Sequence, residues 1–537
     1  GDGKTAVRAG YRTAYNRMVG WALNVLEQRQ PAIGLDPQIR GECMNPTTGA
    51  IGTCSATFTR PLRLSELPLH PRVLVVNGLP TLRVPSPNVI NRTPGNNRLE
   101  SPFFFTDDFK TALVHQWSLS LQRQVTANTM IDIAYVGTRG QNLFRFVNAN
   151  QPNIVGSGFL QEFIRAKNNM AICRAAATSA ACLAAQTAAG VTTANRTTSN
   201  FGFWGLAGQV PLSLFSALFS ATGAQTASGF RDSTNVTNLD QSALGGLVDR
   251  MDKSLGGSRG PLLAFGNDSF FRPNPQFDVA GYGASISNSW YNGLEASVRH
   301  RRGGLHMEAN YTFSRSLDDS SNETVGAGTG FDFPVDSTNI RLNKARSDFD
   351  INHQFRAFFE YDLPLGRGQR FGGELGGVLN HLLGGWRVNT IWDISSGSPF
   401  TVSSGRQTNN YFITTRADCV PGSRVLGGVD RLDSRGGIWF FSASDKTAFT
   451  TPAPGGIGTC GRNTFTGPGF FQVDLGVFKK FDITESWKLD FRVEMYNATN
   501  TANFFGPTTN IQLSTFGKIT NTRIQPRVMQ FAFKLRF

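Results

Sequence analysis

The stretch LEASVRHRRGGLHMEANYTF, residues 294–313, decides the fold. Apolar side chains stand at every second position from Leu294 to Val298 and again from Leu305 to Phe313, with polar or charged residues between them. A period of two is typical of a β-strand that has one apolar and one polar face. Two glycines, Gly303 and Gly304, separate the two runs. The stretch therefore predicts a tight β-hairpin.

The same alternation recurs from one end of the chain to the other. It is found at 4–15, 116–122, 131–135, 354–362, 386–395, 471–477, 487–495 and 529–537. Runs of about ten residues suit a tilted crossing of a bilayer, and a charged face opposite an aromatic one suits a watery lumen inside and lipid outside. A soluble β-sandwich also alternates and is the alternative. We predict an all-β protein, an antiparallel transmembrane β-barrel.

The connections between these runs fall into two classes. Short ones, 126–129, 302–304 and 482–486, and an intermediate one, 364–384, alternate with long ones, 16–110, 138–290, 317–350, 397–469 and 499–524. Outer-membrane barrels have short periplasmic turns and long extracellular loops. We therefore place the C-terminus in the periplasm and the long loops outside. The connection 138–290 is too long to lack structure, and its helix-like patches at 160–188, 201–224 and 238–255 predict a folded cap.

Composition excludes several classes of protein. The 537 residues carry a net charge of +14, but the basic residues are spread along the chain without a basic run or motif. We therefore expect no direct nucleic-acid binding. No run of about 18 apolar residues predicts a spanning helix. Hydrolase, metalloprotease and kinase motifs are absent from the sequence, so we expect neither enzymatic activity nor a cofactor.

The cysteines form three local pairs: Cys43 with Cys54, Cys173 with Cys182, and Cys419 with Cys460. None has the CxxC spacing of a metal site. All six lie in long connections, so disulfides in an oxidising compartment are predicted. Six free thiols are the alternative.

Two sets of charged residues are candidates for binding. Asp318, Asp319 and Glu323 lie in one predicted outside loop and could supply oxygen ligands to Ca²⁺, or form only a solvated acidic loop. The second set lies on the polar face of the strands, where it would contact a solute or a plug, or pair across neighbouring strands. Its members are Glu295, Arg299, Glu308, Arg356, Glu360, Arg387, Asp393, Asp490, Arg492 and Glu494.

Aromatic residues at the ends of the strands predict girdles at the two membrane surfaces. Those toward the outer rim are Trp117, Tyr135, Trp290, Tyr291, Tyr311 and Phe313, and those toward the inner rim are Trp386, Phe481, Trp487 and Phe537.

Several stretches resemble the β-barrel of Oar-like TonB-dependent transporters. They are HQWSLSLQRQVTANTMIDIAYVGTRG (115–140), the stretch 291–321, RSDFDINHQFRAFFEYDLPLG (346–366), residues 461–504 and the last strand. The resemblance implies an outer-membrane barrel of about 22 strands that follows a plug. We expect residues 1–537 to lack the plug, the TonB-contacting segment and about half of these strands. We thus expect residues 1–537 to be the C-terminal portion of such a barrel, with 138–290 as its extracellular cap loop.

The resemblance also implies partners. The last strand, with Phe533, Leu535 and the terminal Phe537, is similar to the signal read by the barrel-assembly machinery, which an exposed edge strand could engage by strand addition. TonB would act through the plug, and lipid of a Gram-negative-type outer membrane would surround the strands. The implied function is uptake of an unidentified solute. A surface adhesion or scaffold protein and a passive porin are the alternatives.

Overall fold

The computed structural model describes most of the chain. The described ranges are 3–15, 42–61 without 55 and 58, 73–76, 79–82, 103–220, 228–254, 271–321 without 275 and 276, and 333–537 without 411, 412, 424, 426 and 485.

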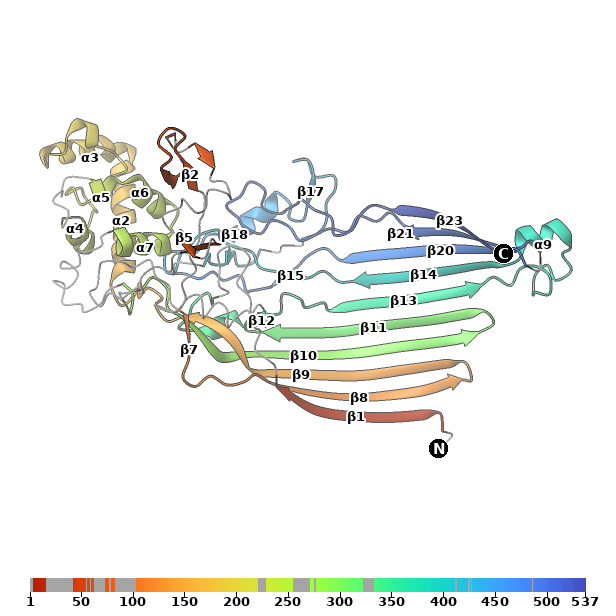
Figure 1. Cartoon of the computed structure of the whole chain (residues 1–537). Coiled ribbons are helices and arrows are strands. Elements are labelled where there is room, and N and C mark those ends of the chain that lie inside the picture. Colours follow the sequence, from red (N-terminus) through yellow and green to blue (C-terminus); the bar gives the residue numbers. More distant parts are fainter. Residues whose placement is uncertain are drawn as a thin grey trace.

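The core of the fold is an antiparallel meander in which each long strand pairs with the next along the chain (Figure 1). Its strands are β1 (Thr5–Tyr15), β8 (Leu113–Thr126), β9 (Thr129–Asn148), β10 (Gly281–Arg302), β11 (Leu305–Asp318), β13 (His353–Asp362), β14 (Trp386–Ser395), β20 (Phe470–Asp482), β21 (Lys488–Tyr496) and β23 (Val528–Arg536). Within the described residues the sheet is open, because β1 pairs only with β8 and β23 only with β21. The predicted antiparallel, mostly β architecture is confirmed.

Short strands extend the sheet or form small sheets near it. β7 (Phe103–Phe105) pairs in parallel with β10, and β12 (Ala345–Arg346) pairs with β11. The small sheets comprise β2 (Glu42–Met44) with β3 (Ile51–Thr53) and β4 (Arg60–Pro61), β5 (Val73–Val76) with β6 (Leu79–Leu82), β15 (Pro399–Phe400) with β19 (Phe465–Thr466), β16 (Asp418–Cys419) with β18 (Phe449–Thr450), and β17 (Ile438–Trp439) with β22 (Lys518–Ile519).

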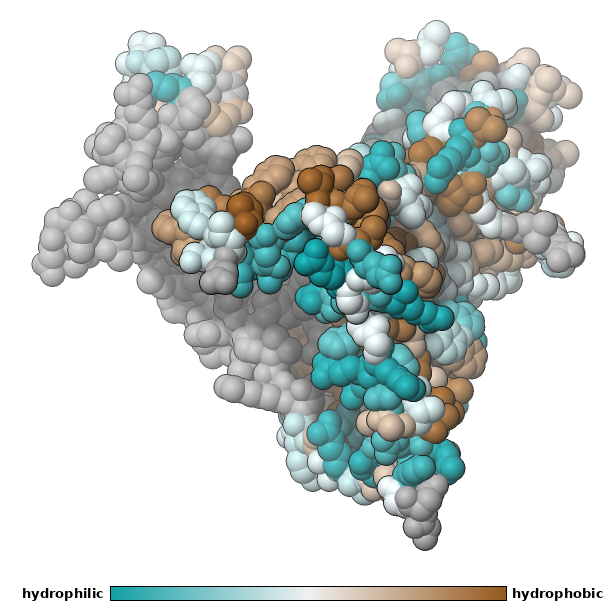
Figure 2. Space-filling model, turned by 90° about the vertical axis from the view of Figure 1, so that its right-hand side faces the viewer, coloured by the Kyte–Doolittle hydropathy of each residue, from teal (hydrophilic) through white to brown (hydrophobic). Residues whose placement is uncertain are grey.

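The register keeps apolar residues on one face across the whole sheet. The row that contains Ile133 runs through Leu121 on β8 and Ala296 on β10. The predicted hairpin forms as expected, since Arg302 pairs with Leu305 and both turn glycines have positive φ, 60° at Gly303 and 79° at Gly304. Viewed from the short-turn end, Figure 2 shows hydrophobic residues on the convex side of the curved sheet and hydrophilic residues on its concave side.

The short and long connections lie at opposite ends of the sheet (Figure 1). Both chain ends and the turns β8–β9, β10–β11 and β20–β21 share one end, together with the β13–β14 connection, which contains helix α9 (Gly377–Leu383). The helices of the long connections and the small sheets lie at the other end. No helix in the described part of the chain is long and apolar enough to cross a membrane.

The long connection between β9 and β10 folds into a helical cap, residues 149–280. Both strands continue further than predicted, to Asn148 and from Gly281, so the connection is shorter than 138–290. Phenylalanines such as Phe159, Phe163 and Phe215 form its buried core. Its helices are α2 (Phe159–Arg174), α3 (Ala176–Ala188), η2 (Thr193–Asn195), α4 (Ser213–Ser220), α5 (Ser228–Arg231), α6 (Ser233–Asp240) and α7 (Leu244–Ser254).

The helix-like patches are only partly helical. Residues 160–188 form two helices that meet at Ala175, whereas 201–212 contains no helix, consistent with its glycines and Pro211. The patch 238–255 is divided between α6 and α7; residues 221–224 and 255 lie outside the described ranges.

A second buried cluster joins the β14–β20 and β21–β23 connections. Phe441, Phe449 and Phe516 pack together in it. Two short helices, η3 (Ile340–Asn343) and η4 (Ser444–Ala448), belong to the same end of the molecule as the small sheets. The three predicted disulfides, Cys43–Cys54, Cys173–Cys182 and Cys419–Cys460, are present in the structure.

Candidate functional site

The concave face of the sheet carries all ten charged residues that the sequence analysis assigned to the polar face. Cross-strand register aligns them: Glu295 lies opposite Ala134, Glu308 opposite Arg299, and Arg356 opposite Asp393. Because side chains alternate between the faces of a strand, these residues point away from the apolar row. One predicted girdle residue, Tyr291, also belongs to this polar face, since it neighbours Trp290 and pairs with Ser316.

Many of these charges pair across neighbouring strands. The N–O distance is 3.4 Å from Arg299 to Glu308 and 3.3 Å from Arg356 to Asp393. Arg387 lies 3.7 Å from Glu360 and also binds the strand-end carboxylate of Asp362 at 2.6 Å. Each of these half-exposed ion pairs stabilises the folded protein by at most about 1 kcal/mol. The charged side chains of this face therefore stay hydrated and can exchange partners.

The remaining members of the set have other surroundings. Asp490 binds Arg536 of the last strand, and the Arg492 guanidinium lies 5.9 Å from the centre of the Phe478 ring. Within the described residues, Glu295 and Glu494 make no ion pair. Their carboxylates are therefore available to an incoming group.

A polar cavity of about 760 Å³ lies on this face near the short-turn end. Glu360, Arg387, Arg492 and Arg536 contribute to its lining. Its size is within the range of small-molecule sites. Both basic and acidic side chains line it, so its chemistry suits a polar or zwitterionic group.

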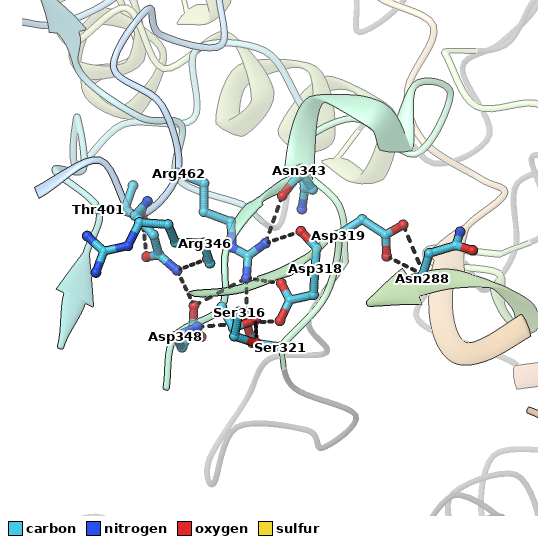
Figure 3. Close-up of polar contacts among 12 residues, drawn as sticks. Asn288, Ser316, Asp318, Asp319, Ser321, Asn343, Arg346, Asp348, Thr401 and Arg462 are labelled. Atoms are coloured by element: carbon cyan, nitrogen blue, oxygen red, sulfur yellow. Dashed lines mark hydrogen bonds and ion pairs between the residues drawn. The ribbon is translucent and has the colours of Figure 1, made fainter. Parts of the chain in front are cut away.

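At the opposite end of the sheet, Arg462 of the β14–β20 connection binds the end of β11 and the β11–β13 connection (Figure 3). Its guanidinium donates to the Asp318 carboxylate at 2.6 Å, to the Asn343 carbonyl at 2.7 Å and to the Ser321 hydroxyl at 2.5 Å. Its contact with Asp348 is 3.3 Å long. These partners come from the end of β11 and from the β11–β13 connection. Arg462 therefore binds the β14–β20 connection to the long-loop end of the sheet.

Two neighbouring arginines at the long-loop end, Arg462 and Arg416, differ in how well nearby carboxylates compensate their charge. Burial lowers the pKa of Arg462, but the nearby Asp318 and Asp348 outweigh burial and raise the pKa above its usual value. Burial, with added repulsion from Arg462, lowers the pKa of Arg416 to about 10. Arg462 was missed by the sequence analysis because its partners are more than a hundred residues away and no local pattern marks them.

The acidic loop considered for calcium has other partners in the structure. Asp318 binds Arg462, and the Asp319 carboxylate accepts the backbone N–H of Asn288 at 3.1 Å. Glu323 lies outside the described residues. In the part of the chain that the structure describes, no group of three or more His, Cys, Asp or Glu residues could hold a metal ion.

A continuous sheet with an apolar convex face, a charged concave face and loops of very different length at its two ends defines a membrane-spanning β protein. The model of the family "Outer membrane beta barrel domain" matches residues 1–530, and the chain belongs to this family. The protein therefore resides in the outer membrane, and the convex face is its lipid-facing surface.

Solved structures give a weaker likeness. The outer membrane transporter YddB from Escherichia coli is 7% identical at a TM-score of 0.31, with 83% of this chain and 35% of that chain covered. The FrpB iron transporter from Neisseria meningitidis (F3-3 variant) is 8% identical at 0.28, with coverage of 81% and 32%. The ferripyoverdine receptor of Pseudomonas aeruginosa is 10% identical at 0.27, with coverage of 79% and 27%. The chain thus spans about a third of the length of these structures. No curated protein matched it in sequence.

Proposed function

We propose that this chain is the barrel portion of a TonB-dependent receptor of the Oar-like type that takes up a solute across the outer membrane. The observation that carries the proposal is a charged, water-accessible concave face beneath a folded cap. A protein that served only as an anchor would not need a polar cavity of about 760 Å³ on its inner face.

The proposed path starts at the extracellular rim and follows the concave face. Solute would bind first among the long connections and the cap. Glu295 and Glu494, which have no ion-pair partner within the described residues, would then meet either the solute or a plug. The pairs Arg299–Glu308 and Arg356–Asp393 would exchange partners during passage, since half-exposed ion pairs are weak.

TonB and the barrel-assembly machinery are the proposed protein partners. TonB would act through a plug, and assembly would read the last strand. Within the described residues β23 pairs only with β21, which leaves an edge for strand addition, and Phe533 and the following Phe537 are 69% and 87% exposed. The proposed activity is transport and includes no chemical step.

Uptake can be tested in cells that make the full protein, with and without TonB. The readout is depletion of small molecules from a defined medium, followed by mass spectrometry. We expect at least one solute to be depleted only when both the protein and TonB are present. Charge reversal at Arg492 and Glu494 should slow that depletion without lowering the amount of protein in the outer membrane.

Two results would overturn the proposal. One is that every small molecule in the medium is depleted to the same extent with and without the protein. The other is unaltered uptake in the double charge-reversal variant, which would remove the concave face from the path.

A further inference from the structure

The β13–β14 connection differs from the tight turns at the same end of the sheet. It runs from residue 363 to 385 and contains α9, whereas β10 and β11 are joined through only Gly303 and Gly304. Four apolar side chains of α9 are exposed: Val378 (74%), Leu379 (55%), Leu382 (57%) and Leu383 (46%). A group of exposed apolar side chains on a folded surface indicates a site that contacts lipid or another molecule.

The spacing of these residues gives α9 one apolar side. Positions 378, 379, 382 and 383 repeat at one and four residues, which places them on the same face of a helix. The other side of the helix carries Asn380, whose side-chain oxygen accepts the backbone N–H of Arg367 at 2.7 Å. Asn380 and His381 line the polar cavity of the concave face. The apolar side therefore points away from the lumen.

Two contacts attach the helix to the lipid-facing surface. The Trp386 indole N–H donates to the Leu382 carbonyl at 2.9 Å, and Trp386 shares the apolar face of β14 with Val388 and Trp392. The Lys479 ammonium donates to the Gly384 carbonyl and lies 5.3 Å from the Trp386 ring and 5.1 Å from the Phe481 ring. These contacts hold the C-terminal end of α9, which carries Leu382 and Leu383, beside the aromatic residues of this end of the lipid-facing surface.

The segment before the helix is ordered and basic. Phe371 donates its backbone N–H to the Pro364 carbonyl at 3.0 Å, and its own carbonyl accepts the N–H of Gly366 at 3.0 Å. The Phe371 ring is 54% exposed, and the Arg370 guanidinium lies 5.5 Å from its centre. Exposed Arg367 and Arg370 outnumber Glu374, the acidic residue of this connection.

We propose that the β13–β14 connection is a membrane-surface anchor whose occupant is the phospholipid of the leaflet at the short-turn end. The apolar side of α9 and Phe371 would enter the boundary between headgroups and acyl chains, and Arg370, beside the Phe371 ring, would face the phosphates. Apolar side chains beside basic ones are the composition of interfacial segments. The attachment of α9 beside the aromatic residues of the lipid-facing surface favours lipid over a protein partner. The proposal requires only residence in a bilayer and is independent of transport.

Site-directed spin labelling of the full chain in vesicles tests this proposal. The vesicles contain phosphatidylethanolamine and phosphatidylglycerol, and the variants are Val378→Cys, Leu379→Cys and Leu382→Cys. In the described residues all cysteines are disulfide-bonded, so the label attaches at the introduced site. Matched controls are His381→Cys on the polar side of the same helix and Ala127→Cys in the exposed β8–β9 turn.

The measured quantity is collision of the label with oxygen relative to a water-soluble nickel chelate. We expect labels at the three apolar sites to collide more with oxygen, which concentrates in the bilayer, and labels at both control sites to collide more with the nickel chelate. Nickel accessibility at the apolar sites equal to that of Ala127→Cys would overturn the proposal. Each label replaces one exposed side chain, and the folding of each variant is checked by the resistance of its sheet to denaturation by detergent.

Discussion

Two adjacent residues of β9, Ile133 and Ala134, allow a direct test of which face of the sheet touches lipid. Ile133 lies on the convex face between Leu121 and Ala296, is 45% exposed and is several residues from the nearest turn. Ala134 lies on the concave face, directly opposite Glu295. Arginine at Ile133 would place a cation in hydrocarbon, whereas arginine at Ala134 would meet water and a carboxylate.

The expected difference is large. Arginine on the lipid face near the bilayer midplane costs about 2–4 kcal/mol, which corresponds to roughly 30- to 900-fold in the folding equilibrium constant. On the concave face a new pair with Glu295 offsets the lost side chain, so Ala134→Arg should cost less than about 1 kcal/mol.

Urea titration of each variant in lipid vesicles, followed by tryptophan fluorescence, measures these costs. Folding must be shown to be reversible for each variant before the midpoints are compared. Equal destabilisation by Ile133→Arg and Ala134→Arg would refute the assignment of the two faces, and with it the proposed path along the concave face.

Three further predictions concern the connections at the long-loop end. In the cap, burial raises the pKa of Glu162 above 4.5, although backbone N–H groups of α4 oppose this shift. The folded cap therefore loses stability as pH rises from 4.5 through the folded pKa, and hydrogen exchange of the cap should show this slope in the native chain and not in Glu162→Gln. Arg272 is fully buried among Asp249, Asp252 and Asp278. Arg272→Ala should lower the stability of the cap by about 3–5 kcal/mol, because it leaves the buried carboxylates uncompensated. Unchanged protection of the cap from hydrogen exchange in this variant would contradict that reasoning. Removal of the Cys419–Cys460 disulfide, which spans 41 residues, should cost about 4 kcal/mol, against about 2.6 kcal/mol for Cys173–Cys182 with its separation of 9, as measured by thermal unfolding in detergent.

Alternation was enough to find the ten long strands and the faces of their residues, except for Tyr291 and for the extensions of β9 and β10. Each strand, from the one at Thr5 to the last at Val528, shows a local period of two, and a local period needs no information about distant residues. The cysteine pairs were also predictable, because the two cysteines of each pair lie in the same connection between long strands.

The contacts of Arg462 at the long-loop end were not predictable in this way. Arg462 meets Asp318 across 144 residues, and the choice of this pair depends on how the β11–β13 and β14–β20 connections fold against each other at the long-loop end of the sheet. The helix of the β13–β14 connection was likewise missed, because seven residues carry too little periodicity to be distinguished from a turn.

The sequence by itself determined which side chains of the long strands share a face, Tyr291 excepted, since the two-residue period of a strand places alternate positions on opposite faces. Only the tertiary structure decided which charges of the concave face pair with one another, where the long connections are bound together, and how α9 joins the lipid-facing girdle. These features depend on register and loop packing between residues far apart in the chain, and no local pattern encodes them.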